Sequence, residues 1–108
     1  TWSKPWKTPI WGYPADVIEL KDGRLLCTYG YRQKPFGVRA VLSRDGGKSW
    51  DLEHAIVLRD DGGTGDLGYP SSVEFADGRV LTVYWINHEK ADDPKSATRY
   101  VAGTFYRP

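Results

Sequence analysis

The sequence predicts an all-β protein made of two unequal repeats of short strands. Twelve glycines and seven prolines among 108 residues supply many turns, and short apolar runs lie between them. Gly12-Tyr13-Pro14 recurs as Gly68-Tyr69-Pro70, and Asp22-Gly23-Arg24 recurs as Asp77-Gly78-Arg79, each about 55 residues later. An internal period of this length, filled with short strands, is typical of repeated β-sheet architectures.

In the first repeat, Asp-Gly turns and apolar runs predict four strands, at residues 16–20, 25–31, 38–42 and 53–58. In the second repeat the same signals predict three strands, at residues 72–75, 80–86 and 99–106. The second strand of each repeat is apolar at nearly every position, which is typical of a sheet packed on both faces. The pattern therefore predicts propeller blades or a similar array of sheets.

The two ends of the chain predict one blade that is split between them. Residues 4–10 resemble an outer strand, whereas the second repeat stops after its third strand. We expect a blade-closing outer strand in residues 1–11, a full blade in 12–59 and three inner strands in 66–108. Two blades alone would expose apolar sheet faces. The ring is then completed by a homotrimer of this chain or by the remainder of a longer chain.

A distinctive motif lies between the third and fourth predicted strands, where Ser43, Asp45, Gly47 and Trp50 have the spacing Ser-x-Asp-x-Gly-x-x-Trp. Glycine supplies positive φ, aspartate accepts backbone N–H bonds, and tryptophan can cover the turn. The motif resembles the Asp-box of the sialidase-like (BNR-repeat) β-propeller family. The resemblance covers nearly the whole chain and is closest to the C-terminal part of uncharacterised sialidase-like hydrolases. It implies two four-stranded blades of a six-bladed propeller, with the Asp-box as a structural turn.

The resemblance also implies a position for catalysis. Sialidases use a tyrosine nucleophile in a Tyr-Ser-x stretch, followed by a strand and an Asp-Gly hairpin. Tyr69 is the position that matches this pattern, and Asp66 is the second catalytic candidate. The match is imperfect, because Pro70 stands between Tyr69 and Ser71. Since Gly-Tyr-Pro also occurs at Tyr13, the alternative is an aromatic residue that lines the channel, with proline fixing the start of the strand.

Strand order places the loops at 11–16, 31–39, 59–72 and 87–99 on one face, where propellers usually bind ligands. The candidate substrate-binding residues on this face are Arg32, Arg39, Arg99 and Tyr13. Arg39 and Arg99 start strands that look equivalent in the two repeats, so we expect both at the same rim. Arginine binds carboxylates through paired hydrogen bonds, which suits a sugar acid. The alternative is that each arginine caps a strand end or pairs with Asp16 or Asp66.

Composition excludes several classes of function. A net charge of +1 gives no electrostatic basis for binding nucleic acid or an anionic membrane, and no apolar run approaches a membrane span. His54 and His88 have no cysteine cluster beside them, and no cofactor motif is present, so we expect no metal and no cofactor.

The sequence therefore predicts a glycoside-hydrolase-related module that acts on or binds anionic, sialic-acid-type glycans once its ring is complete. If it is an enzyme, the resemblance implies an exo-α-sialidase, and it makes a secreted or periplasmic location plausible. The alternative is a carbohydrate-binding or structural propeller module without catalysis.

Overall fold

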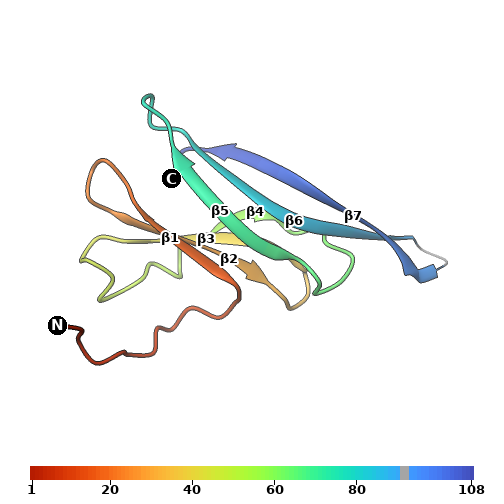
Figure 1. The fold of residues 1–108 in the computed structure, drawn as a ribbon, viewed down its shortest axis with the longest axis horizontal. Helices are drawn as coiled ribbons and strands as arrows, with labels where there is room; N and C mark the ends of the chain where they lie inside the picture. Colours follow the sequence, from red (N-terminus) through yellow and green to blue (C-terminus); the bar gives the residue numbers. More distant parts are fainter. Residues whose placement is uncertain (91–92) are drawn as a thin grey trace.

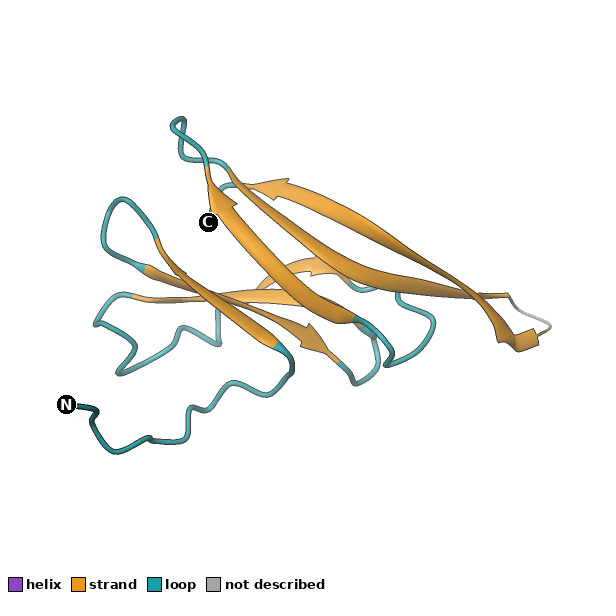
Figure 2. Ribbon diagram, viewed as in Figure 1, coloured by secondary structure: helices purple, strands orange, loops and turns teal. Residues whose placement is uncertain are grey.

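The computed structural model describes residues 1–90 and 93–108 (Figure 1). Residues 91 and 92, inside the predicted second repeat, lie outside the described residues. The described chain contains strands and loops and no helix (Figure 2). The seven strands are β1 (Ala15–Glu19), β2 (Leu25–Tyr31), β3 (Gly37–Ser43), β4 (Ile56–Arg59), β5 (Gly68–Glu74), β6 (Val80–Lys90) and β7 (Asp93–Tyr106).

The strands form two antiparallel sheets, which confirms the all-β prediction. Sheet A has the order β1-β2-β3-β4 and sheet B has the order β5-β6-β7. The two Asp-Gly hairpins join β1 to β2 and β5 to β6, as the repeats predicted. In both hairpins the aspartate accepts the backbone N–H of the arginine two residues later, at 3.0 Å for Asp22–Arg24 and for Asp77–Arg79.

Several predicted boundaries differ from the structure. The strand predicted at 72–75 begins at Gly68 and ends at Glu74, and the strands predicted at 16–20 and 38–42 differ by one residue at each end. The fourth strand begins at Ile56 rather than at 53, because a turn in which Asp51 accepts the backbone N–H of His54 at 3.2 Å occupies the start of the predicted range. The predicted loop at 87–99 was wrong, since β6 and β7 continue into it and pair Asn87 with Arg99. Residues 4–10 form no strand, so the closing outer strand stays a prediction that this single chain does not realise.

Each sheet has two faces, which we name by the alternation along the second strand. The front of sheet A carries Leu26, Thr28 and Ala40, and its back carries Cys27, Tyr29 and Val41. The main core lies between the front of sheet A and one face of sheet B, where the buried apolar residues are Leu20, Leu26, Val38, Ala40, Leu58, Leu67, Val80, Tyr84 and Ile86. We call this face the back of sheet B, and its other face, with Leu81, Val83 and Trp85, the front.

The back of sheet A carries a second, smaller cluster. Cys27, Tyr29 and Val41 are buried there beneath partly buried neighbours that include Ile10 and Trp50. Burial raises the pKa of the Cys27 thiol to about 11. Sheet A is therefore packed on both faces, as the uninterrupted apolar run of β2 predicted.

A chain of hydroxyl groups crosses the interface between the sheets. The Ser72 hydroxyl lies 3.1 Å from the Thr28 hydroxyl and 2.9 Å from the Thr82 hydroxyl, and Tyr106 contacts Thr82 at 2.9 Å. The backbone N–H of Ser72 donates to Asp16 at 2.9 Å. Since buried polar groups are costly without partners, this row of hydroxyl contacts favours one alignment of the two sheets over others.

Candidate functional site

The two sheets approach closely where Gly30 of β2 meets Gly68 of β5. A Cβ atom on Gly30 would lie 2.7 Å from the carbonyl oxygen of Tyr13 and 3.1 Å from the Cα atom of Gly68. The backbone N–H of Tyr13 donates to the carbonyl of Gly30 at 3.0 Å, which fixes the segment that leads into β1. Only glycine permits this approach, and it brings the equivalent Gly-Tyr-Pro segments of the two repeats to one end of the molecule.

Arg32, at the end of β2, lies between the two tyrosines of these segments. Its guanidinium carbon is 4.9 Å from the ring centroid of Tyr13 and 5.8 Å from that of Tyr69. Its Nε donates to the carbonyl of Leu67 at 3.1 Å, which orients the guanidinium group. Cation–π contact with two rings holds the charge in place without neutralising it. We call Tyr13, Arg32 and Tyr69 the arginine clamp.

In the part of the chain that the structure describes, Arg32 donates a hydrogen bond through Nε and none through its two Nη groups. Among the described residues no carboxylate lies within ion-pair distance of Arg32, whereas Arg24, Arg59, Arg79 and Arg99 each pair with an aspartate. A half-buried guanidinium that has aromatic neighbours and no acidic partner is suited to an incoming carboxylate. The structure thus brings together three of the residues that the sequence predicted at this face.

Tyr69 adopts an unusual backbone conformation. Its φ is 51°, it follows Gly68 at φ 117°, and the pairing of β5 with β6 shifts register between Gly68 and Ser71. A positive φ at a non-glycine residue costs roughly 1–3 kcal/mol, and such strain concentrates at functional sites. The irregularity turns the Tyr69 ring outward, where it is 67% exposed. Its hydroxyl makes no hydrogen bond within the described chain, so the predicted nucleophile has no carboxylate partner there.

Asp66, the second predicted catalytic residue, is engaged by Arg99. The Arg99 Nε lies 3.0 Å from the Asp66 carboxylate, which realises the alternative that this arginine pairs with an acid. The loop that carries Asp66 is held by Asn87, which is fully buried. The Asn87 amide donates to the carbonyl of Asp66 at 2.6 Å and accepts the backbone N–H of Thr64 at 2.9 Å. The role of Asn87 could not be predicted from the sequence, because one polar residue at the end of an apolar strand carries no local signal.

Arg39 lies elsewhere. It stacks on Tyr31, with its guanidinium carbon 3.5 Å from the ring centroid, on the back of sheet A. The expected equivalence of Arg39 and Arg99 was wrong. Arg39 pairs with Tyr29, whereas the repeat equivalent of that tyrosine, Tyr84, pairs with Ala102. The two arginines therefore occupy different rows of their sheets and do not share one rim position.

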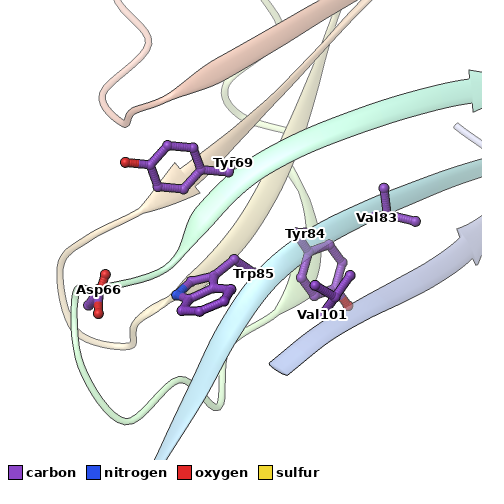
Figure 3. A pocket seen from close by; sticks show the side chains of 6 residues that line it. All are labelled: Asp66, Tyr69, Val83, Tyr84, Trp85 and Val101. Atoms are coloured by element: carbon purple, nitrogen blue, oxygen red, sulfur yellow. The ribbon is translucent and has the colours of Figure 1, made fainter. Parts of the chain in front are cut away.

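A shallow hollow of about 440 Å³ opens beside Tyr69 on the front of sheet B. Figure 3 shows the side chains that line it, which are Asp66, Tyr69, Val83, Tyr84, Trp85 and Val101. Trp85 comes from β6, as Val83 does, and its ring extends from that strand toward Asp66 (Figure 3). Asp66 is the charged residue among those that line the hollow, and the others are apolar or aromatic.

The Asp-box forms the structural turn that the motif predicted, on the stretch from Ser43 to Trp50. The Asp45 carboxylate accepts the Ser43 hydroxyl at 2.8 Å and the backbone N–H of Ser49 at 2.8 Å, and the Ser43 hydroxyl oxygen accepts the N–H of Gly47 at 2.8 Å. Hydrogen bonds from the side chain and backbone of Ser49, and from Ser43, lower the pKa of Asp45 to about 2. Trp50 packs over this end of the back of sheet A.

The described residues contain no group of three or more metal-ligating side chains, and none of their secondary structure is a helix that could cross a membrane. The expectation of no metal and no cofactor stays a prediction.

No family model and no curated protein matches the chain. A solved structure does: the crystal structure of a protein of unknown function from Dyadobacter fermentans, at 38% sequence identity and a TM-score of 0.76. The similarity covers 93% of this chain and 26% of that protein, so the chain spans about a quarter of its length. The similarity supports the arrangement of the two sheets and assigns no activity.

Proposed function

We propose that this chain is part of a sialidase-like β-propeller that binds a carboxylated sugar at the arginine clamp. The observation that carries the proposal is Arg32, whose guanidinium is held between Tyr13 and Tyr69 and has no acidic partner in the described chain. The internal repeat, the two stacked sheets and the Asp-box turn support the propeller architecture. In that architecture sheets A and B are neighbouring blades.

The clamp matches the chemistry of a sugar acid in two respects. The two Nη groups of Arg32 can donate a pair of hydrogen bonds to one carboxylate, which is the geometry that arginine favours. The exposed rings of Tyr13 and Tyr69, which are 57% and 67% exposed, offer apolar surface to the C–H groups of a pyranose ring and hydroxyls to its polar groups. Sialic acid carries both a carboxylate and such a ring.

The test compares N-acetylneuraminic acid with its methyl ester, which has the same ring and no charge. NMR titration of the wild-type chain should show binding of the acid and at least tenfold weaker binding of the ester, because a charge-assisted pair contributes roughly 1.5–3 kcal/mol. Arg32→Ala should reduce the affinity for the acid to that for the ester. Arg39→Ala is the matched control, since Arg39 is an arginine stacked on a tyrosine at another place.

Two results would overturn the proposal. One is equal affinity of the wild type for the acid and the ester, because the carboxylate would then contribute nothing. The other is a loss of acid binding in Arg39→Ala that equals the loss in Arg32→Ala. Arg99→Ala tests the remaining predicted arginine, and we expect a smaller effect because Arg99 engages Asp66.

Catalysis by Tyr69 is the second candidate, and the strained backbone and exposed side chain of this residue favour it. A tyrosine nucleophile needs a base, and no carboxylate contacts its hydroxyl in the described chain. The base would therefore come from another part of the assembled ring. Hydrolysis of a fluorogenic sialoside that disappears in Tyr69→Phe, with sugar binding retained, would establish this function. Binding without hydrolysis would leave a carbohydrate-binding module.

A further inference from the structure

The front of sheet B is an exposed apolar surface. Cross-strand pairs place its residues on one face, since Leu81 pairs with both Val73 and Phe105, and Trp85 pairs with Val101. Val101 is 70% exposed, Phe105 is 56% exposed and Val73 is 52% exposed. The opposite face of the same sheet is buried in the core. A soluble chain rarely leaves a contiguous apolar face of this kind without a partner.

The internal repeat identifies what this face is built to contact. Superposing the Asp-Gly-Arg turns matches three residues on the front of sheet A with three on the front of sheet B: Leu26 with Leu81, Thr28 with Val83 and Gly30 with Trp85. The same superposition matches the back of sheet A with the back of sheet B: Leu25 with Val80, Cys27 with Thr82 and Tyr29 with Tyr84. Within the chain, a front packs on a back.

A coordinated change of residue types supports a second contact of this kind. At the contact within the chain, Thr28 on the front and Thr82 on the back are both polar and are joined through the hydroxyl of Ser72. Their equivalents, Val83 on the free front and Cys27 on the back of sheet A, are both apolar. The free front and the back of sheet A thus both lack the polar group that links the two sheets within the chain, and Cys27 itself is buried beneath Ile10 and Trp50.

The back of sheet A remains apolar at its surface. Its centre is buried, but Val17 on β1 and Val57 on β4 flank that centre and are 52% and 50% exposed. Front and back are different surfaces, so contact between them is head-to-tail and leaves a free front and a free back at the ends of each dimer. We infer that copies of this chain associate head-to-tail, with the front of sheet B of one copy packed on the back of sheet A of a second copy. This inference does not depend on sugar binding.

Complementation between two variants tests the inference. Val101→Lys blocks the front and Val17→Lys blocks the back, and both positions are exposed, so the fold should tolerate them. By light scattering coupled to gel filtration, the wild type should exceed the mass of one chain. Each variant alone should be monomeric, with self-association weakened by about tenfold or more. An equimolar mixture should form a one-to-one complex, because one intact front and one intact back remain. Gln33→Lys, in an exposed loop, is the control and should behave as the wild type.

Three results would overturn the inference. A wild type that stays monomeric at about 100 µM would show that a second copy does not cover the front, and would leave further repeats of a longer chain as its cover. Association of Val17→Lys by itself would indicate symmetric contact between two fronts. A mixture of the two variants that stays monomeric would exclude front-to-back contact. Circular dichroism of each variant, matching that of the wild type, ensures that a lost complex reflects a lost interface.

Discussion

Gly30→Ala should destabilise the protein at the contact between the two sheets. The added Cβ would lie 2.7 Å from the carbonyl oxygen of Tyr13, 3.1 Å from the Cα atom of Gly68 and 3.1 Å from the carbonyl oxygen of Leu67. All three atoms belong to the backbone, so no side-chain rotation can relieve the contact. The strands themselves have to move apart, at the point where they position Tyr13 and Tyr69.

The expected magnitude follows from two opposing terms. Overpacking costs roughly 1–3 kcal/mol, and the upper part of this range applies because the crowded atoms are backbone atoms. Replacing glycine by alanine also lowers the entropy of the unfolded chain, which stabilises the fold by about 0.4–1 kcal/mol. The net loss is then about 2 kcal/mol, or a decrease in melting temperature of roughly 8–15 °C for a domain of this size.

Thermal and urea unfolding followed by circular dichroism measure this loss. Gly65→Ala is the matched control, since a Cβ there meets its nearest neighbours at 3.7 Å, which is ordinary van der Waals contact. We expect Gly65→Ala to melt within a few degrees of the wild type. If Gly30→Ala and Gly65→Ala melt together, the two sheets are not in contact at Gly30, and the placement of the clamp loses its basis.

Two further predictions concern the Asp-box. Trp50→Ala should lower the free energy of unfolding by about 3 kcal/mol, which is the low end for tryptophan because the side chain is only half-buried. The affinity for N-acetylneuraminic acid should not change. An unchanged urea midpoint would contradict the covering role of this ring. Asp45 has a pKa lowered from 3.8 to about 2, so its stabilising effect is present above pH 3.8 and is lost as the pH falls through about 2. As the pH falls from 3.8 to about 2, the free energy of unfolding of Asp45→Asn should therefore decrease less than that of the wild type. Acid unfolding of both proteins measures this, and an equal decrease in the two would contradict the assigned hydrogen bonds.

Local features of this protein could be predicted from the sequence. Strand β2 has the bounds that its apolar run predicted, and the Asp-box turn has the hydrogen bonds that its residues predicted. The turn depends on hydrogen bonds between residues two to four positions apart, and the strand is indicated by an uninterrupted apolar run. An aspartate four residues before Ser49 reaches its N–H in any chain that makes this turn, whatever surrounds it. The same reasoning placed the two Asp-Gly hairpins.

Side-chain placement across the sheets could not be predicted in this way. Similarity of sequence matched Arg39 with Arg99, but pairing matches Arg39 with Ala102, three residues later. Because side chains alternate between the two faces of a strand, an odd shift moves a residue to the opposite face. Sequence similarity over four residues does not determine such a shift. Hydrogen-bonded register does.

The candidate site shows the same division. The sequence identified Tyr13, Arg32, Tyr69, Asp66 and Arg99 as residues at one end of the molecule, because strand order alone decides which loops share a face. It could not show that Arg32 lies between Tyr13 and Tyr69, or that Asp66 is engaged by Arg99. Those contacts join residues between 19 and 37 positions apart, and the contact of Arg32 with Tyr69 also needs the close approach of the two sheets at Gly30 and Gly68. Short-range hydrogen bonds thus determined the turns, apolar runs in the sequence indicated the strands, and tertiary contacts decided which charges have partners, because a charge finds its partner only after distant segments are brought together.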